Sequence, residues 1–144
     1  MDVTNAVYPP GEQFVEFFAV EEDGPFVMVN LLKFKERADY GEGSTDEPTG
    51  REAYERYGAE VTKLVEAGGG RLAFSGHVSG ILLGEVEELW DAVALVEYPS
   101  HAAFQEMMRS PEWAAIEHHR NAGLAGQLNI RATAQGTTAR SGVK

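Results

Sequence analysis

The sequence contains no cysteine, few basic residues and no long apolar run. Without cysteine in its 144 residues, the chain has no disulfides, no thiolate metal ligands and no cysteine nucleophile. Its 12 basic and 23 acidic residues give a formal charge of −11, which repels nucleic acids and anionic membranes. No apolar stretch approaches the ~20 residues that span a bilayer, and Met1–Gln13 lacks the features of a signal peptide. We therefore expect a soluble, cytoplasmic protein with neither nucleic-acid nor membrane partners.

The composition predicts one folded domain, with an extension before it and a flexible tail after it. Hydrophobic residues make up 43% of the chain, enough to bury a core in a domain of this length. We expect residues 1–24 to form an extension with a short helix at Glu12–Val20, because three phenylalanines recur there at helical spacing. Residues 25–133 are then the domain, and the small, polar residues 134–144 are expected to form a flexible tail.

Within the domain, strand-like and helical patterns follow one another in a definite order. Helical periodicity marks 51–67, which ends at three glycines, and the two consecutive segments 100–108 and 110–121. Residues 35–50 contain glycines and acids and read as a long loop. Strands are expected at 26–34, 71–83, 90–98 and 125–133. The order βαββαβ predicts an α+β, ferredoxin-like fold with a four-stranded antiparallel sheet and its helices on one face.

The predicted third strand is apolar on both faces. Val93 and Leu95 lie on one side of it, and Ala92, Ala94 and Val96 lie on the other. A strand of this kind needs cover on both faces, and the helices supply cover for only one. We therefore expect the chain to pair with itself, as a homodimer built through the sheet face, over an interface above ~2,000 Å².

Five segments of the sequence carry a resemblance to a known family: MVNLLKF (28–34), EAYERYGAEV (52–61), GGGR (68–71), EYPSHAAF (97–104) and SPEWAAI (110–116). In these segments the chain resembles a bacterial family of unknown function in the dimeric α/β-barrel superfamily. The resemblance covers about three quarters of the chain and implies the ferredoxin-like dimeric barrel, with no established reaction. Wider relatives include cofactor-free monooxygenases acting on polyketide-like aromatics, small lactone isomerases, haem enzymes and stress-response proteins.

Strand alternation assigns a group of polar and aromatic side chains to a common face, which we expect to be the one away from the helices. His77 is the candidate general base or orienting donor, or else a partly exposed strand histidine. Asn30 is a second catalytic candidate, or else an amide that satisfies backbone groups. The substrate-binding candidates are Tyr98, Trp90, Asn129 and Ser75. For Tyr98 and Trp90 the alternative is packing in the core of the dimer. Tyr54 and Tyr57 are expected in the core.

No motif calls for a metal or a cofactor. His118 and His119 are adjacent in a helix and point ~100° apart, so they cannot chelate one ion together, and we expect neither metal nor cofactor. The acidic residues of 35–50, expected beside the cavity mouth, favour a neutral or cationic ligand. Two functions remain open. The first is a small-molecule-binding protein, which in its enzymatic form is a cofactor-free monooxygenase or isomerase acting on a partly aromatic compound. The second is a non-catalytic interaction module whose barrel core is filled.

Overall fold

A computed structural model describes residues 1–41 and 47–134, so residues 135–144 of the predicted tail and the middle of the long loop lie outside the described part. The described part contains four helices and four strands. In chain order they are α1 (Gly11–Phe18), β1 (Phe26–Phe34), α2 (Gly50–Ala67), β2 (Arg71–His77), β3 (Ala92–Tyr98), α3 (His101–Arg109), α4 (Pro111–Gly123) and β4 (Leu124–Ala132).

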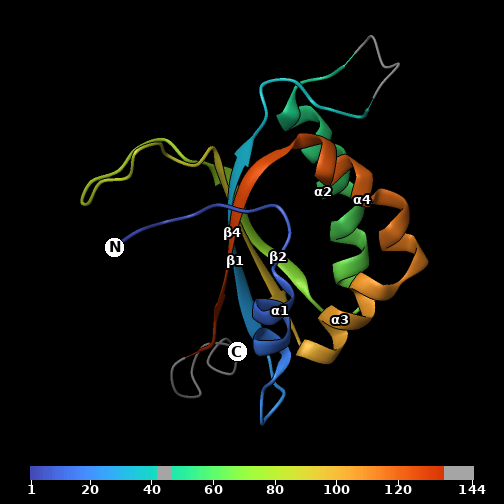
Figure 1. The fold of residues 1–144 in the computed structure, drawn as a ribbon. Helices are drawn as coiled ribbons and strands as arrows, with labels where there is room; N and C mark the ends of the chain where they lie inside the picture. The colour runs from blue at the N-terminus through green and yellow to red at the C-terminus, as the bar shows by residue number, and fades with distance from the viewer. Residues whose placement is uncertain (42–46, 135–144) are drawn as a thin grey trace.

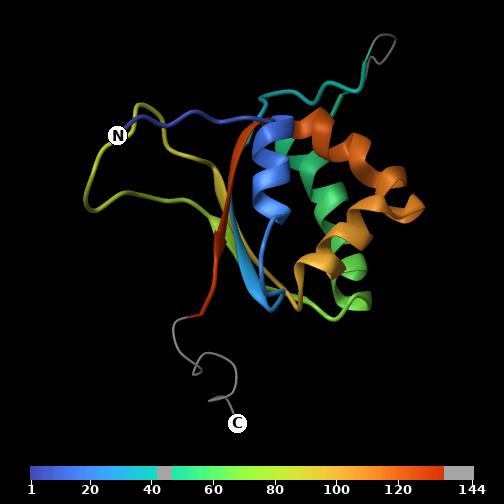
Figure 2. The ribbon, with the colours of Figure 1, turned by 60° about the horizontal axis from the view of Figure 1, so that its bottom comes forward.

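The strands form one antiparallel sheet in the order β2-β3-β1-β4, as the ferredoxin-like prediction requires. Figures 1 and 2 show the sheet nearly edge-on, with α1, α2, α3 and α4 all on the same side of it. The α+β fold is therefore confirmed. No helix in the described part of the chain is long and apolar enough to cross a membrane.

Local signals in the sequence set the helix boundaries. Thr49 and Glu52 form a reciprocal capping box at the start of α2. The Ser100 hydroxyl accepts from the Ala103 backbone N–H to cap α3, and Ser110 does the same for α4, with Pro111 at the first helical position. The break between the two predicted helical segments is thus a new cap.

The second strand is shorter than predicted, because it ends at His77 and not at residue 83. Its partner β3 begins at Ala92, opposite His77, so no strand is available to pair with residues beyond that point. One further bond, from Val78 N–H to the Asp91 carbonyl, closes the ladder. Residues 78–91 instead project from the side of the sheet opposite the helices (Figure 1).

The ends of α2 and α4 pack together through glycine. A methyl group on Gly123 would lie 2.4 Å from the Gly50 carbonyl oxygen, and one on Gly50 would lie 2.1 Å from that of Lys35. The Lys35 N–H donates to the Gly123 carbonyl, and the Gly50 N–H donates to that of Lys35. This close approach ties the start of the long loop to both helices.

The two faces of the sheet have different surroundings. On the inner face, Phe26, Met28 and Tyr98 pack with Val65 of α2 and Phe104 of α3. Because side chains alternate along a strand, the residues between these point to the outer face, on the side of the sheet away from the described helices. The apolar residues on that outer face are Val27, Val29, Leu31, Phe74, Val93, Leu95, Leu128 and Ile130.

Candidate functional site

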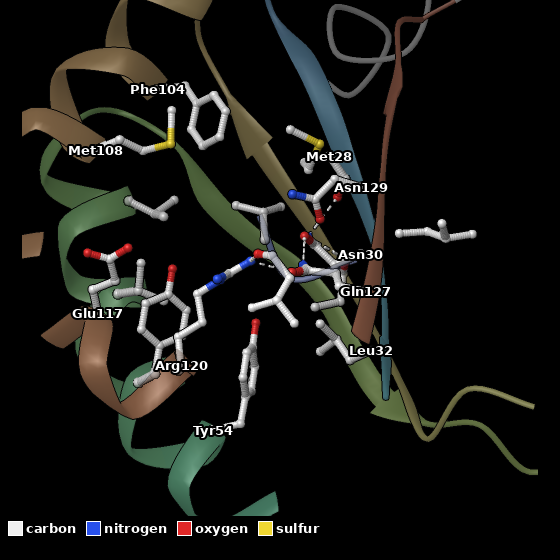
Figure 3. Close-up of a pocket in the computed structure, with 18 of the residues that line it drawn as sticks. Met28, Asn30, Leu32, Tyr54, Phe104, Met108, Glu117, Arg120, Gln127 and Asn129 are labelled. Atoms are coloured by element: carbon white, nitrogen blue, oxygen red, sulfur yellow. Dashed lines mark hydrogen bonds between the residues drawn. The ribbon is translucent and has the colours of Figure 1, made fainter. Parts of the chain in front are cut away.

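A cavity of about 1220 Å³ lies between the inner face of the sheet and the helices. Its walls are mostly apolar, with Leu32 and Met28 on the sheet and Phe104 and Met108 on α3 (Figure 3). The N-terminal segment also contributes, since Val7, Tyr8 and other residues before β1 line it. Ligand pockets in proteins commonly have this composition, apolar with a few placed polar groups.

The predicted site residues other than Trp90 share a face, but it is the face covered by the helices, and the expectation that it points away from them is wrong. The strand register places Ser75, Ala94, Asn30 and Asn129 in one row across all four strands. All four residues line the cavity. Alternation shows which residues lie together, whereas only the packing of the helices decides which side they cover.

Asn30 lies on the central strand β1, and the structure accounts for both ends of its amide. The nitrogen donates to the carbonyl of Ala94 at 3.1 Å and, more distantly, to that of Met28. The oxygen accepts from Gln127 Nε2 at 2.9 Å, and the Gln127 oxygen accepts from Arg120 at 2.8 Å. This chain of hydrogen bonds fixes the orientation of both amides on the cavity floor.

Two tyrosines of α2 face the same space. The Tyr54 ring packs on Phe34 and Tyr57, and its hydroxyl points from the helix toward Gln127 (Figure 3). Burial raises the pKa of Tyr54, so the group is a neutral hydrogen-bond donor near neutral pH. The Tyr57 hydroxyl accepts from the Trp113 indole N–H at 3.1 Å. The prediction that both tyrosines belong to the core therefore overlooks that the Tyr54 hydroxyl faces the cavity.

His77 lines the cavity at its rim, on the exposed end of β2. Its Nδ1 lies 2.6 Å from Arg51 Nη1, and the Arg51 guanidinium stacks over the Phe34 ring. A guanidinium can only donate, so Nδ1 accepts and the neutral imidazole carries its proton on Nε2. This geometry favours the orienting donor over the general base among the two predicted roles.

The two aromatic candidates, Tyr98 and Trp90, lie in different places. Tyr98 is buried between Phe26 and Phe104 while still lining the cavity, and burial raises the pKa of its phenol. Trp90 lies outside β3 and outside the cavity, with its indole N–H donating to Asn5 Oδ1 at 2.7 Å. Trp90 therefore contacts the N-terminal segment, and its predicted place on the common face is wrong.

Arg120 and Gln127 are two polar cavity residues that the sequence predictions missed. Gln127 lies two residues before Asn129 on β4, so alternation already places both on one face. Arg120 follows Trp113 by seven residues in α4, which is two helical turns and therefore the same side. Arg120 also donates to the Val7 carbonyl at 2.8 Å, which holds the N-terminal segment against the cavity.

Two of the other three histidines, His101 and His119, have hydrogen-bond partners within the protein. His101 is buried, with Nδ1 2.9 Å from Asp23 Oδ1 and Nε2 3.0 Å from Arg131. His119 Nδ1 lies 2.7 Å from the Tyr40 hydroxyl, and burial lowers the pKa of His119. Among the described residues, no three acidic or histidine side chains gather as a metal site would require.

The cavity carries more basic than acidic groups. Its charged lining residues in the described part of the chain are Arg51, Arg109 and Arg120 on the basic side and Glu55 and Glu117 on the acidic side. This balance contrasts with the formal charge of −11 for the whole chain. None of the described residues of 35–49 lines the cavity, so the acidic loop that favoured a neutral or cationic ligand is not part of its wall.

Among the solved structures that are similar to this chain, two crystal structures match nearly its whole length. A crystal structure of methylated RPA0582 protein is 36% identical, with a TM-score of 0.83, covering 93% of this chain and 98% of that one. A crystal structure of RPA0582, a protein of unknown function from Rhodopseudomonas palustris, is 36% identical with a TM-score of 0.81, covering 93% and 100%.

A more distant structure is that of a dabb family protein with a ferredoxin-like fold from Mesorhizobium loti. It is 14% identical with a TM-score of 0.48, covering 78% of this chain and 99% of that one. No curated protein matches the chain. The family described as a domain of unknown function, DUF1330, matches residues 44–132. That match spans more than half of the sequence and confirms the resemblance to a family of unknown function. The chain belongs to the DUF1330 family.

Proposed function

We propose that this chain binds a small, partly aromatic molecule in the cavity between the sheet and the helices of a single protomer. One observation carries the proposal: a cavity of about 1220 Å³ where a purely structural module would have a filled core. Polar side chains from three elements, Asn30, Gln127 and Tyr54, face this space among apolar neighbours (Figure 3). That arrangement supports ligand binding over the interaction-module alternative.

The enzymatic form of this function, a cofactor-free monooxygenase or isomerase, is a second candidate. The observation in its favour is the His77–Arg51 pair at the cavity rim, which presents a fixed imidazole N–H beside a cation. Such groups orient a substrate and stabilise charge that develops on it. In this mechanism His77 and Arg51 position the substrate, and Tyr98 packs against it as part of the wall.

Native mass spectrometry of protein taken directly from cells tests the binding function. We expect the wild type to carry a non-covalent adduct and Ala94→Trp to lack it, because Ala94 lies in the middle of the cavity floor and the indole fills the space. Ala102→Trp, on the exposed side of α3, is the matched control and should keep the adduct. An identical adduct on Ala94→Trp would place the ligand elsewhere and contradict the proposal.

We further propose that a second copy of the chain covers the outer face of the sheet. The centre of this face is apolar, with Val29, Leu31 and Leu95 on the two central strands. Its charged residues are already paired within the chain, Lys33 with Asp91 and Arg71 with Glu97. A self-complementary apolar patch whose bordering charges are neutralised suits a two-fold dimer.

The projecting segment 78–91 supports the same assembly. It leaves the sheet on the side opposite the helices (Figure 2), and within it Leu82 and Leu83 are 101% and 86% exposed. Apolar side chains this exposed are uncommon unless a partner covers them. A protomer seated on the outer face lies beside this segment and can bury both leucines.

A further inference from the structure

Arg120 is a cation in the cavity without a carboxylate partner in the described part of the chain, where no acidic oxygen lies within 4.0 Å of its guanidinium. Its hydrogen bonds go to neutral oxygens, those of Gln127, Val7 and Asn121. A half-buried guanidinium is usually balanced by an anion, because a charge in a low-dielectric site is costly when unpaired. The charge of Arg120 is thus available to a ligand.

Glu117, one turn away on the same helix, does not fill this role. Figure 3 shows its carboxylate on the helix side of the cavity, while the guanidinium of Arg120 extends toward the sheet. The two groups therefore face different parts of the space. Glu117 instead lies close enough to the Tyr57 phenol to help raise the pKa of that group, after burial as the main cause.

The Tyr54 hydroxyl points to the same region as Arg120 (Figure 3). It has no hydrogen-bond partner among the described residues, and the Tyr54 side chain is half-buried in the cavity wall. The two residues interact electrostatically: burial raises the pKa of Tyr54, and the positive charge of Arg120 lowers it in part. A neutral O–H donor and a guanidinium that converge on one place are suited to a negatively charged oxygen.

The rest of the cavity wall indicates the chemistry of the uncharged part of the ligand. Apart from this pair and the amides of Asn30, Gln127 and Asn129, the walls are mostly apolar and include Met28, Val61 and the methionines of α3. Such walls favour a flat hydrocarbon body over a sugar or a nucleotide, which would need many more polar partners. The overall formal charge of −11 weakens long-range attraction of anions, so the local cation must supply the selectivity.

From these contacts we propose that the ligand of the cavity is an aromatic anion, whose ionised oxygen rests between Arg120 and the Tyr54 hydroxyl and whose ring lies against the apolar walls. This inference rests on the proposed binding function and names its ligand class. It replaces the neutral or cationic ligand that the acidic loop suggested, because that charge argument depended on residues that do not line the cavity.

Two fluorescent probes with the same body test the inference: anilinonaphthalene sulfonate, an anion, and phenylnaphthylamine, which lacks the sulfonate. We expect the wild type to bind both, and Arg120→Gln to raise the Kd of the anion at least tenfold while changing that of the neutral probe less than twofold. Tyr54→Phe, which keeps the ring, should raise the Kd of the anion about three- to fivefold. Lys63→Gln makes the same change in net charge at an exposed site and should alter neither Kd.

The outcomes separate the two proposals. If neither probe binds the wild type, the cavity is not a binding site, and the proposed function fails together with the inference. If the neutral probe binds and the anion does not, or if Arg120→Gln and Tyr54→Phe weaken both probes equally, only the aromatic anion is overturned. Tyr54→Phe keeps the test decisive should Arg120→Gln fail to fold, since it removes a single hydroxyl.

Discussion

His77 and Arg51 restrain each other at the rim of the cavity, although both come from solvent-accessible positions at the ends of β2 and α2. An exposed pair contributes little to the free energy of unfolding. Its effect is therefore local: it holds the Arg51 guanidinium over Phe34 and leaves the His77 Nε2–H free of the guanidinium.

For this reason His77→Ala should weaken binding without destabilising the fold. We expect the Tm to change by less than ~2 °C, since surface substitutions stay near ±0.5 kcal/mol. The Kd of the anionic probe should rise about three- to tenfold as Arg51 loses its restraint. Isothermal titration and thermal unfolding measure the two quantities, with Ser79→Ala, an exposed residue outside the cavity, as control. A large loss of Tm with an unchanged Kd would make His77 structural.

Single residues also show where sequence-based prediction of the site ends. Alternation grouped Asn30, Ser75, His77 and Asn129 on one face, because the period of a strand depends only on backbone geometry. It had no means of showing which face the helices cover. Arg120 was missed because it lies in the polar run HHRN, and only its contact with Gln127 distinguishes it from a solvated helix residue.

Among the secondary-structure elements, those with caps or firm periodicity were predicted closely. β1 has the predicted bounds, and α2 differs by one residue. The strand predicted for residues 71–83 was too long since a strand end depends on its partner, and β3 begins only at Ala92. Hydrogen bonds between distant parts of the chain are not contained in a local pattern.

The packing of α2 against α4 gives a matched pair of substitutions. Gly123→Ala places a methyl group 2.4 Å from the Gly50 oxygen and should destabilise by ~1–3 kcal/mol, lowering the Tm by several degrees. Gly58→Ala lies inside α2 with no atom within 4 Å of the new methyl group, and should stabilise by up to ~1 kcal/mol through helix propensity. Thermal unfolding of both variants tests this, and a loss of Tm in Gly58→Ala equal to that in Gly123→Ala would contradict the packing argument.

At the scale of the whole molecule, the four helices of the described residues all lie on one side of the sheet (Figure 1). A dimer through the other side makes the two sheets the centre of the assembly, with both cavities on its outside. Most of the residues that line each cavity come from the inner face, the helices and the N-terminal segment of one chain, so such a dimer would hold one cavity in each protomer.

The assembly is tested by a charge at the centre of the outer face. Val29→Asp places an unpaired carboxylate among apolar residues and should yield monomer or aggregate. The wild type should scatter light as a particle of twice the 15.7 kDa chain mass. Ala102→Asp adds the same charge on the exposed side of α3 and should remain dimeric. A wild type that is monomeric at micromolar concentration would refute the dimer.

The alternation of β1 has a consequence for how proteins with this fold diverge. Met28, Asn30 and Leu32 contact the cavity, while Val27, Val29 and Leu31 lie on the outer face. Under the proposed binding function and the proposed dimer, neighbouring positions of this one strand therefore have separate roles, contact with the ligand on the inner face and contact with the second copy on the outer face. Mutation can change the first while leaving the second intact, so new ligand preferences can arise on an unchanged quaternary scaffold.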